Sequence, residues 1–404
     1  MHQTTPLVLA VLVLGYALVS ERVNRLFVAP ALIFMFAGMA LGPFGFQLLD
    51  AGPGTEGYTV LAQLALALIL FNQAAELRLN RIRMHGPVTL RLLVVGIPLT
   101  LALGTVTAAA VLPVLPWWEA VCLAAIVAPT EAALIEALLK DSRIPERVRH
   151  ALSVESGFYD GFALAVLLIA LGLASQEETG TDQKHWAWFI FSTEIVSLLI
   201  GAGIGLAGGL VVNWSRRNDW MSDTWAQLAT LALAFVCFQI GEWVEASGFV
   251  AAFTGGLAFS FISRRKAGED LPTQVSDATA QLLELMVFAM FGAFAVIDGW
   301  KRADWRVVAF AVIAVFGVRV AAVLISLVRT DMPVSNRLFI GWFGPRGIGT
   351  VVLGLLVINR GDIESGGVIG TVVVVAVTLS LVLHSATAAP GIRRLAASRL
   401  TPSP

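Results

Sequence analysis

The chain has 404 residues, of which 57% are hydrophobic and 14% are charged, and its mean hydropathy is +0.81. This composition lies outside the range of soluble domains and indicates a membrane protein. The formal net charge of −1 gives no support for nucleic-acid binding. Cys122 and Cys237 lie far apart in two apolar segments, so neither a disulfide framework nor a clustered metal site is expected.

Thirteen apolar segments have the length and composition to cross a bilayer, which takes about 20 residues. The first has no Lys or Arg before it, so it is predicted to be a membrane helix rather than a cleaved signal peptide. Residues 1–404 are therefore predicted to form a single transmembrane domain, an all-α polytopic membrane protein. The predicted spans are 5–20, 26–49, 58–75, 88–113, 117–140, 147–174, 187–213, 225–241, 246–263, 275–297, 305–328, 336–358 and 364–387.

Lys and Arg are distributed unevenly between the connections. The connections after spans one, three, five, seven, nine and eleven, together with the C-terminus, contain 20 of these residues, and the other connections contain 5. Connections rich in Lys and Arg stay in the cytoplasm. We therefore predict an N-terminus outside the cell and a short cytoplasmic tail at residues 391–404, with the protein in a bacterial inner (plasma) membrane.

Two spans are interrupted near their middle. Pro129 breaks the fifth span, and Gly344, Pro345 and Gly347 break the twelfth. Interrupted helices at matching positions of two halves are typical of a binding site at an inverted repeat. The sequence thus predicts two inverted repeats of six helices with broken helices 5 and 12. Their predicted ranges are about 5–174 and about 225–387, joined by a linker helix at about 187–213.

Ionisable residues inside the predicted spans are the main functional signal. Each costs at least about 2.5 to 3.5 kcal/mol at the centre of a membrane helix, so it marks a functional site by default. The stretch VESGFYDG places Glu155 and Asp160 five positions apart in the sixth span. The alternative interpretation is a structural ion pair that holds helices in register. The two arginines inside spans are Arg319 and Arg346, and the acids that could match them are Glu131, Glu136, Glu155, Asp160 and Glu284.

The helix breaks themselves offer polar groups. An interrupted helix leaves free carbonyls at the end of its first half and free amides at the start of its second half. We expect Glu131 to offset the amide end in the fifth span and Arg346 to offset the carbonyl end in the twelfth. Carbonyls from Ala128 to Thr130, with the Thr130 hydroxyl, suit a hard, partly dehydrated cation. Asp160, on the next helix, would supply the charged ligand.

Three short motifs resemble those of the monovalent cation/proton antiporter family, in its branch of archaeal and bacterial sodium/proton antiporters related to the animal exchangers. That branch has Thr-Asp-Pro on helix 5, Gly-Glu-Ser-x-x-Asn-Asp on helix 6 and Gly-x-Arg-Gly on helix 12. The corresponding stretches here are Thr130-Glu131-Ala132, Val154 to Asp160 and Gly344 to Gly347. The resemblance extends over nearly the whole chain, and it implies a homodimer in the lipid bilayer.

The resemblance also implies roles for particular residues. Asp160 would bind either the cation or a proton, with oxygens of Ser156 and Thr130 as further ligands. Glu155 would be a structural carboxylate paired with an arginine. The resemblance favours Arg319 as that partner, with Arg346 at the helix break, but the sequence leaves the choice between them open.

The chain departs from the family motifs at three positions. Tyr159 stands where the family has Asn, Glu131 where it has Asp, and Val154 where it has Gly. Tyr159 cannot supply an amide carbonyl, and it puts no second carboxylate beside Asp160, which favours electroneutral exchange. Ala128 and Glu76 are further candidates for lining the site.

The predicted function is secondary active exchange of a monovalent cation, Na⁺ first, for a proton by alternating access, with 1:1 stoichiometry and no cofactor. The alternatives are K⁺/H⁺ exchange, a cation channel and transport of an organic anion. An intramembrane hydrolase is excluded by the absence of a His-Glu-x-x-His motif or a paired nucleophile and base. His384, at the predicted end of the last span, is assigned no role, whereas His150 could sense cytoplasmic pH.

Overall fold

The computed structural model describes residues 4–49, 56–77, 87–131, 134, 136–139, 141–179, 183–263, 272–360 and 363–397. Every regular element in these ranges is a helix. Nine of the described helical segments are long and apolar enough to cross a membrane, and four shorter apolar helices accompany them. The prediction of an all-helical polytopic membrane protein is confirmed.

The first half of the chain follows the predicted spans closely. The helices of predicted spans 147–174 and 187–213 extend a few residues beyond those spans, whereas the helix of predicted span 26–49 covers only Pro30–Leu41 and is followed by turns. The elements are α1 (Thr4–Asn24), α2 (Pro30–Leu41), α3 (Glu56–Glu76), α5 (Pro87–Arg91), η1 (Leu92–Gly96), α6 (Ile97–Val111), α7 (Trp117–Val127), α8 (Glu136–Leu139), α9 (Glu146–Thr179) and α10 (Gln183–Arg217).

The second half differs most from the prediction in its last helix. This helix passes through Pro390 and ends about ten residues beyond the predicted span, so part of the predicted tail is helical. The elements are α11 (Asp223–Trp243), α12 (Gly248–Ser263), α13 (Gln274–Phe291), η3 (Gly292–Val296), α14 (Ile297–Arg302), α15 (Trp305–Val312), η4 (Ile313–Val318), α16 (Arg319–Ser326), α17 (Val334–Trp342), α18 (Ile348–Arg360) and α19 (Gly366–Ala397).

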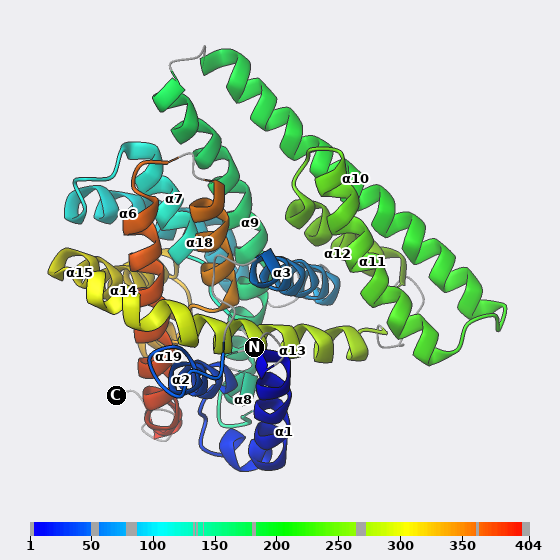
Figure 1. Ribbon diagram of the computed structural model, residues 1–404, viewed down its shortest axis with the longest axis horizontal. Helices are drawn as coiled ribbons and strands as arrows, with labels where there is room; N and C mark the ends of the chain where they lie inside the picture. Colours follow the sequence, from blue (N-terminus) through cyan, green and yellow to red (C-terminus); the bar gives the residue numbers. More distant parts are fainter. Residues whose placement is uncertain are drawn as a thin grey trace.

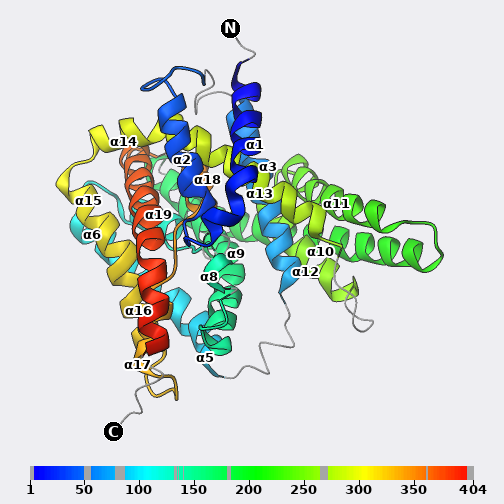
Figure 2. The same cartoon turned by 90° about the horizontal axis from the view of Figure 1, so that it is seen from below.

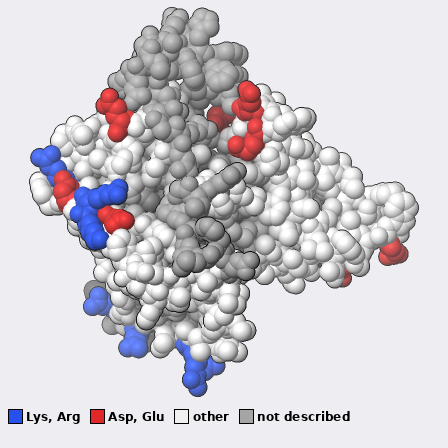
Figure 3. All heavy atoms as spheres, in the orientation of Figure 1, with Lys and Arg blue, Asp and Glu red and all other residues white. Residues whose placement is uncertain are grey.

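The helices form two groups (Figure 1). On one side, α10 packs against α11 and α12, and α12 packs against α3. On the other side, α6, α7 and α9 pack together and α19 packs against α15 and α18. Figure 2 shows that α1 begins at one end of the molecule, whereas α19 ends at the opposite end, near α5 and α17. On the face shown in Figure 3, few charged side chains lie over α10, α11 and α12.

Both predicted interruptions are present and they meet in space. The chain leaves the helical conformation after Val127 of α7 and after Trp342 of α17. Between the half-helices, the Glu131 amide donates a hydrogen bond to the Pro345 carbonyl at 2.8 Å. The crossing needs glycine at position 347, because a Cβ there would overlap with the Glu131 side chain. The two broken segments therefore support each other and leave polar backbone groups in the interior.

Among the described residues, three of the long helical segments contain a π-helical turn: η1, η3 and η4. Such turns occur frequently at functional sites, because each changes the register of the side chains that follow it. Here η4 ends directly before Arg319, one of the two arginines predicted inside the spans.

Candidate functional site

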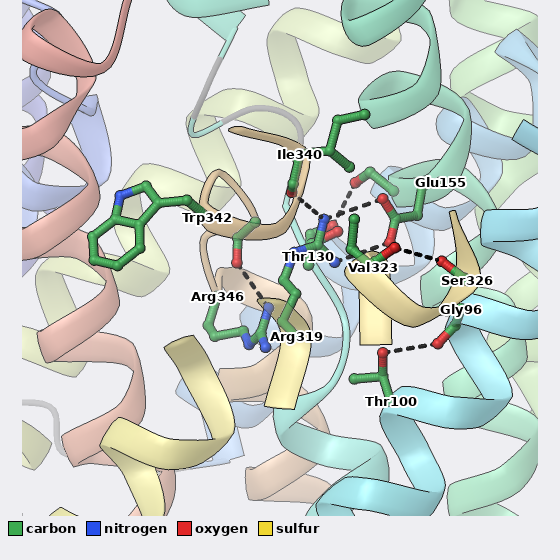
Figure 4. Close-up of polar contacts among 12 residues, drawn as sticks. Gly96, Thr100, Thr130, Glu155, Arg319, Val323, Ser326, Ile340, Trp342 and Arg346 are labelled. Atoms are coloured by element: carbon green, nitrogen blue, oxygen red, sulfur yellow. Dashed lines mark hydrogen bonds and ion pairs between the residues drawn. The ribbon is translucent and has the colours of Figure 1, made fainter. Parts of the chain in front are cut away.

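A buried ion pair joins α9 to α16. Arg319 donates from its two terminal nitrogens to Glu155, at 3.0 Å to Oε1 and 3.1 Å to Oε2 (Figure 4). The Arg319 and Glu155 side chains are only 1% and 2% exposed. Arg319 also lies 3.4 Å from the Ile340 carbonyl on α17. The structure thus pairs Glu155 with Arg319 rather than Arg346, through the parallel two-bond geometry that suits guanidinium and carboxylate.

The break in α17 is shaped around this pair. A Cβ at Gly344 would overlap with the Arg319 guanidinium, so only glycine allows the chain to pass this close. The Arg319 Nε atom has no hydrogen-bond partner among the described residues. The backbone at Gly344 lies against this side of the guanidinium. The sequence signal for this approach was the Gly-Pro-Arg-Gly stretch itself.

Arg346 is buried and binds backbone oxygens at the interruption. One terminal nitrogen donates to the Gly344 carbonyl at 2.7 Å, and the other lies 3.4 Å from the Ala314 carbonyl in η4. Its backbone amide donates to the Ser380 hydroxyl on α19 at 2.8 Å. Arg346 therefore provides positive charge where the chain exposes carbonyls after α17, the place that the sequence analysis expected for it.

His384 belongs to the same network, and the sequence analysis was wrong to give it no role. It was placed at the end of a span, but α19 continues to Ala397, so His384 lies within the helix and is buried. Its Nε2 atom lies 2.7 Å from the Trp342 carbonyl at the end of α17, and its Nδ1 atom lies 2.7 Å from the Ser380 carbonyl. His384 thus links α19 to the broken helix.

Oxygen atoms gather where the α7 break faces α9. The Ser156 hydroxyl donates a hydrogen bond to the Thr130 carbonyl. The Gln73 amide of α3 donates to Glu131 Oε1 at 3.2 Å. Ser156, Thr130 and Glu131 are all buried. Gln73, which the sequence analysis missed, therefore connects the α3 side of the molecule to the broken helix.

Asp160 is the second buried carboxylate of this region, beside Glu131. It is 4% exposed, and its Oδ2 atom has no hydrogen-bond partner in the described part of the chain. Gln73 is a hydrogen-bonding neighbour of Asp160, and Glu131 is a charged neighbour. The start of α18 lies beside Asp160: a Cβ atom placed on Gly349 would be 3.4 Å from Asp160 Oδ1. The Gln73 Oε1 atom, also buried, has no hydrogen-bond partner among the described residues either.

Tyr159 lies on the ion-pair side of α9. It is four residues after Glu155, so the two share a helix face, and its electrostatic neighbours are Glu155, Arg319 and Arg346. The hydroxyl has no hydrogen-bond partner among the described residues. Nearby, the Thr100 hydroxyl donates to the Gly96 carbonyl (Figure 4). Tyr159 therefore lies among Thr100 and the charged groups of the ion pair, and these neighbours differ from those of Asp160.

A cavity of about 150 Å³ separates α3 from α9 beside these groups. Glu76, at the end of α3, is exposed, whereas Ser156 is buried. The cavity therefore connects the surface to the region of the α7 break. Its lining residues are Gln73, Glu76, Leu77, His150, Ser153, Val154, Ser156 and Gly157.

The remaining candidates are more scattered. Ala128 is buried and caps α7, its amide bonding to the Ala124 carbonyl. Glu284 is buried on α13. The side chain of Glu136, together with Ala132, lies outside the described part of the structure. Glu119, which the sequence analysis did not consider, is buried in the first turn of α7, and its Oε2 atom has no hydrogen-bond partner among the described residues.

Comparison with known proteins identifies the family. Residues 8–393 match the family described as "Sodium/hydrogen exchanger, transmembrane". The chain belongs to this family. Membership puts it among membrane transporters rather than enzymes, and the match covers every charged residue of the site described above.

Relatives in the sodium/hydrogen exchanger family include antiporters named for different cations. The chain is 26% identical over 342 residues to the "K(+)/H(+) antiporter NhaP" of Alkalimonas amylolytica, covering 84% of this chain and 57% of that protein. It is 26% identical over 361 residues to the "Probable Na(+)/H(+) antiporter C3A11.09" of Schizosaccharomyces pombe, covering 84% and 46%. The chain thus spans about half the length of these relatives.

The fold is similar to that of an archaeal member. The sodium proton antiporter MjNhaP1 from Methanocaldococcus jannaschii superimposes with a TM-score of 0.72, covering 94% of this chain and 98% of that chain. Sequence identity between the two is 19%, so this likeness establishes the fold alone.

Proposed function

We propose that this chain exchanges a monovalent cation for a proton across the membrane, and that Asp160 binds the two in competition. The observation that carries the proposal is a buried carboxylate beside an oxygen-rich helix break, with one oxygen that has no hydrogen-bond partner among the described residues. An ionised carboxylate without a partner is costly in a low-dielectric interior. A proton or a small cation removes that cost, and only one of them can occupy the same oxygens.

The neighbouring residues supply the other cation ligands. The Thr130 carbonyl and hydroxyl, the Ser156 hydroxyl and Gln73 Oε1 are neutral oxygen donors, which suit hard monovalent cations. With one exchanging carboxylate, one cation replaces one proton, so the exchange is electroneutral with 1:1 stoichiometry. Glu155 and Arg319 remain paired and neutral throughout, and they hold α9 against α16 as the site moves.

Alternating access follows from the arrangement of the helices. The nine long and four shorter apolar helices correspond to thirteen transmembrane spans, with two inverted repeats of six and the broken helices crossing at the site. An odd number of spans agrees with helix ends at opposite sides of the molecule (Figure 2). The charge distribution puts the N-terminus outside and the C-terminus in the cytoplasm. The cavity between α3 and α9 is the cytoplasmic route, and two copies form a homodimer.

Sodium is the proposed cation, and potassium is the alternative. The relatives carry names of both kinds, and neutral oxygens beside one carboxylate can accommodate either ion. The test is reconstitution in liposomes with an internal pH dye and external Na⁺, K⁺ or Li⁺. Proton movement driven by Na⁺ supports the proposal, movement driven by K⁺ alone supports the alternative, and no movement with any cation contradicts both. Clamping the membrane potential with an ionophore should leave an electroneutral rate unchanged.

Gln73→Ala is expected to raise the half-saturating cation concentration about tenfold, which corresponds to roughly 1.4 kcal/mol of binding free energy. The variant loses one oxygen ligand, and it also loses the amide that bonds to Glu131. The concentration dependence of exchange in liposomes measures this. Gln63→Ala is the matched control, since Gln63 is a half-buried glutamine on the same helix. An unchanged half-saturating concentration in Gln73→Ala would exclude Gln73 from the site.

A further inference from the structure

A second cavity, of about 380 Å³, lies at the end of the molecule where α5 and α17 begin (Figure 2). It is bounded by the short helix α5, the start of α9 and the connection between α16 and α17. Three arginines, one from each of these segments, line it: Arg91, Arg147 and Arg329. None of them takes part in the site around Asp160.

The cavity carries an excess of positive charge. Arg147 and Arg329 are exposed, and neither side chain forms a hydrogen bond or ion pair within the described part of the chain. Arg91 uses one terminal nitrogen to bind the Val328 carbonyl at 2.6 Å. Asp331 is the one carboxylate among the residues that line this cavity. Among the described residues it forms no ion pair with the arginines, so the described lining carries more positive than negative charge.

The connection between α16 and α17 is held in a defined shape. Arg337 donates to the Met332 carbonyl and to the Thr330 carbonyl, both at 2.8 Å. Arg329 has φ 59°, a left-handed conformation that a bulky residue rarely adopts. Such a conformation persists only where the surrounding structure fixes it, and it occurs preferentially at functional sites. The connection that carries Arg329 is therefore held by these two hydrogen bonds of Arg337.

We propose that this cavity binds a phosphate-bearing anion. Arginine offers a planar fork of N–H donors that matches the oxygens of a phosphate group. The volume falls in the range of small-molecule sites, about 300 to 1,000 Å³. A membrane-lipid headgroup and a free phosphorylated molecule share this chemistry. Basic residues that only set the orientation in the membrane would be spread over the cytoplasmic surface. Here three arginines from segments distant in sequence line one cavity.

An anion bound in this cavity would link two helices that carry residues of the cation site. The start of α9 leads to Glu155 and Asp160, and the connection after α16 follows the helix that carries Arg319. An anion that bridges Arg147 and Arg329 ties these helices together at one end. Ligands that bind only the folded state raise its stability.

The test is thermal unfolding of the purified full-length chain in a neutral detergent. Inorganic phosphate, compared with chloride at equal ionic strength, is expected to raise the melting temperature by about 3 °C or more. The double variant Arg147→Gln with Arg329→Gln should lose this shift. The control Arg22→Gln with Arg25→Gln removes two exposed arginines at the end of α1 and directly after it, outside the cavity, and should keep it. Without phosphate, all three proteins should unfold at the same temperature.

A second arm identifies the source of the phosphate group. The same proteins are placed in vesicles of phosphatidylcholine alone or of phosphatidylcholine with phosphatidylglycerol. If phosphatidylglycerol raises the melting temperature of the wild type but not of the double variant, and phosphate in detergent has no effect, the ligand is a lipid headgroup. If phosphate in detergent raises the melting temperature of the wild type but not of the double variant, the ligand is a free phosphate. The proposal is overturned by no shift in either arm, by a shift that survives in the double variant, or by a shift that the control variant also loses.

Discussion

Liposomes that contain Asp160→Asn are expected to move no more protons in response to a cation gradient than empty liposomes do. Asparagine has nearly the same shape as aspartate, so the helix packing around α9 and α18 is retained. It carries no charge and does not titrate, so it can neither compensate a cation nor release a proton. The internal pH dye used for the wild type measures the loss directly.

Two variants make this result specific. Asp298→Asn removes a carboxylate that is 45% exposed on α14, and it should exchange at the wild-type rate. Asp160→Glu keeps the charge on a longer side chain and should keep part of the activity with a changed cation preference. Proton movement at the wild-type rate in Asp160→Asn would mean that another group, such as Glu131, performs the exchange.

The second large effect is expected on stability. Replacing one partner of the Glu155–Arg319 pair, in Glu155→Gln or Arg319→Gln, should reduce the free energy of unfolding by about 3 to 5 kcal/mol, because an unpaired charge is left in the interior. The pair is 3.0 Å apart and almost fully buried. Thermal unfolding in detergent detects such a loss as a lower melting temperature.

The chain provides a matched control for this prediction. Lys301 and Asp298 form an exposed pair at 3.7 Å on α14, and pairs of this kind contribute about 0 to 1 kcal/mol. Lys301→Gln should therefore leave the melting temperature nearly unchanged. In a double-mutant cycle, Glu155→Gln combined with Arg319→Gln should cost less than the sum of the two single changes. Additive costs would show that the two side chains do not stabilise each other.

The sequence predicted the helical architecture because apolar length and proline position are local properties. The breaks at Pro129 and at Gly344 to Gly347 could be located to within a few residues, since proline and glycine weaken a helix locally, although α19 continues through Pro390. The hydrogen bond between Glu131 and Pro345 could not be predicted, because it depends on how two distant segments cross.

The residues of the site were predictable where they carry charge in an apolar segment. Glu155, Asp160, Arg319 and Arg346 stand out for that reason. The choice of Arg319 as the partner of Glu155 needed the structure, because both arginines lie in spans far from α9 in sequence. The orientation of Tyr159 could have been inferred, since it follows Glu155 by four residues on one helix.

The missed residues share a different property. Gln73 is uncharged and lies at the end of an apolar helix, so its contact with Glu131 leaves no signal in composition. His384 was missed because the helix boundary was placed too early. Such neutral or terminal residues acquire a role only through tertiary contacts, which a single sequence does not reveal.

The most direct measurement of the central claim is proton release on cation binding. Purified protein in weakly buffered detergent solution, with a pH indicator, is titrated with Na⁺ or K⁺, and choline serves as the control cation. The competition at Asp160 predicts about one proton released for each cation bound by the wild type, and none by Asp160→Asn. Cation binding to the wild type without proton release, or equal release from Asp160→Asn, would contradict it.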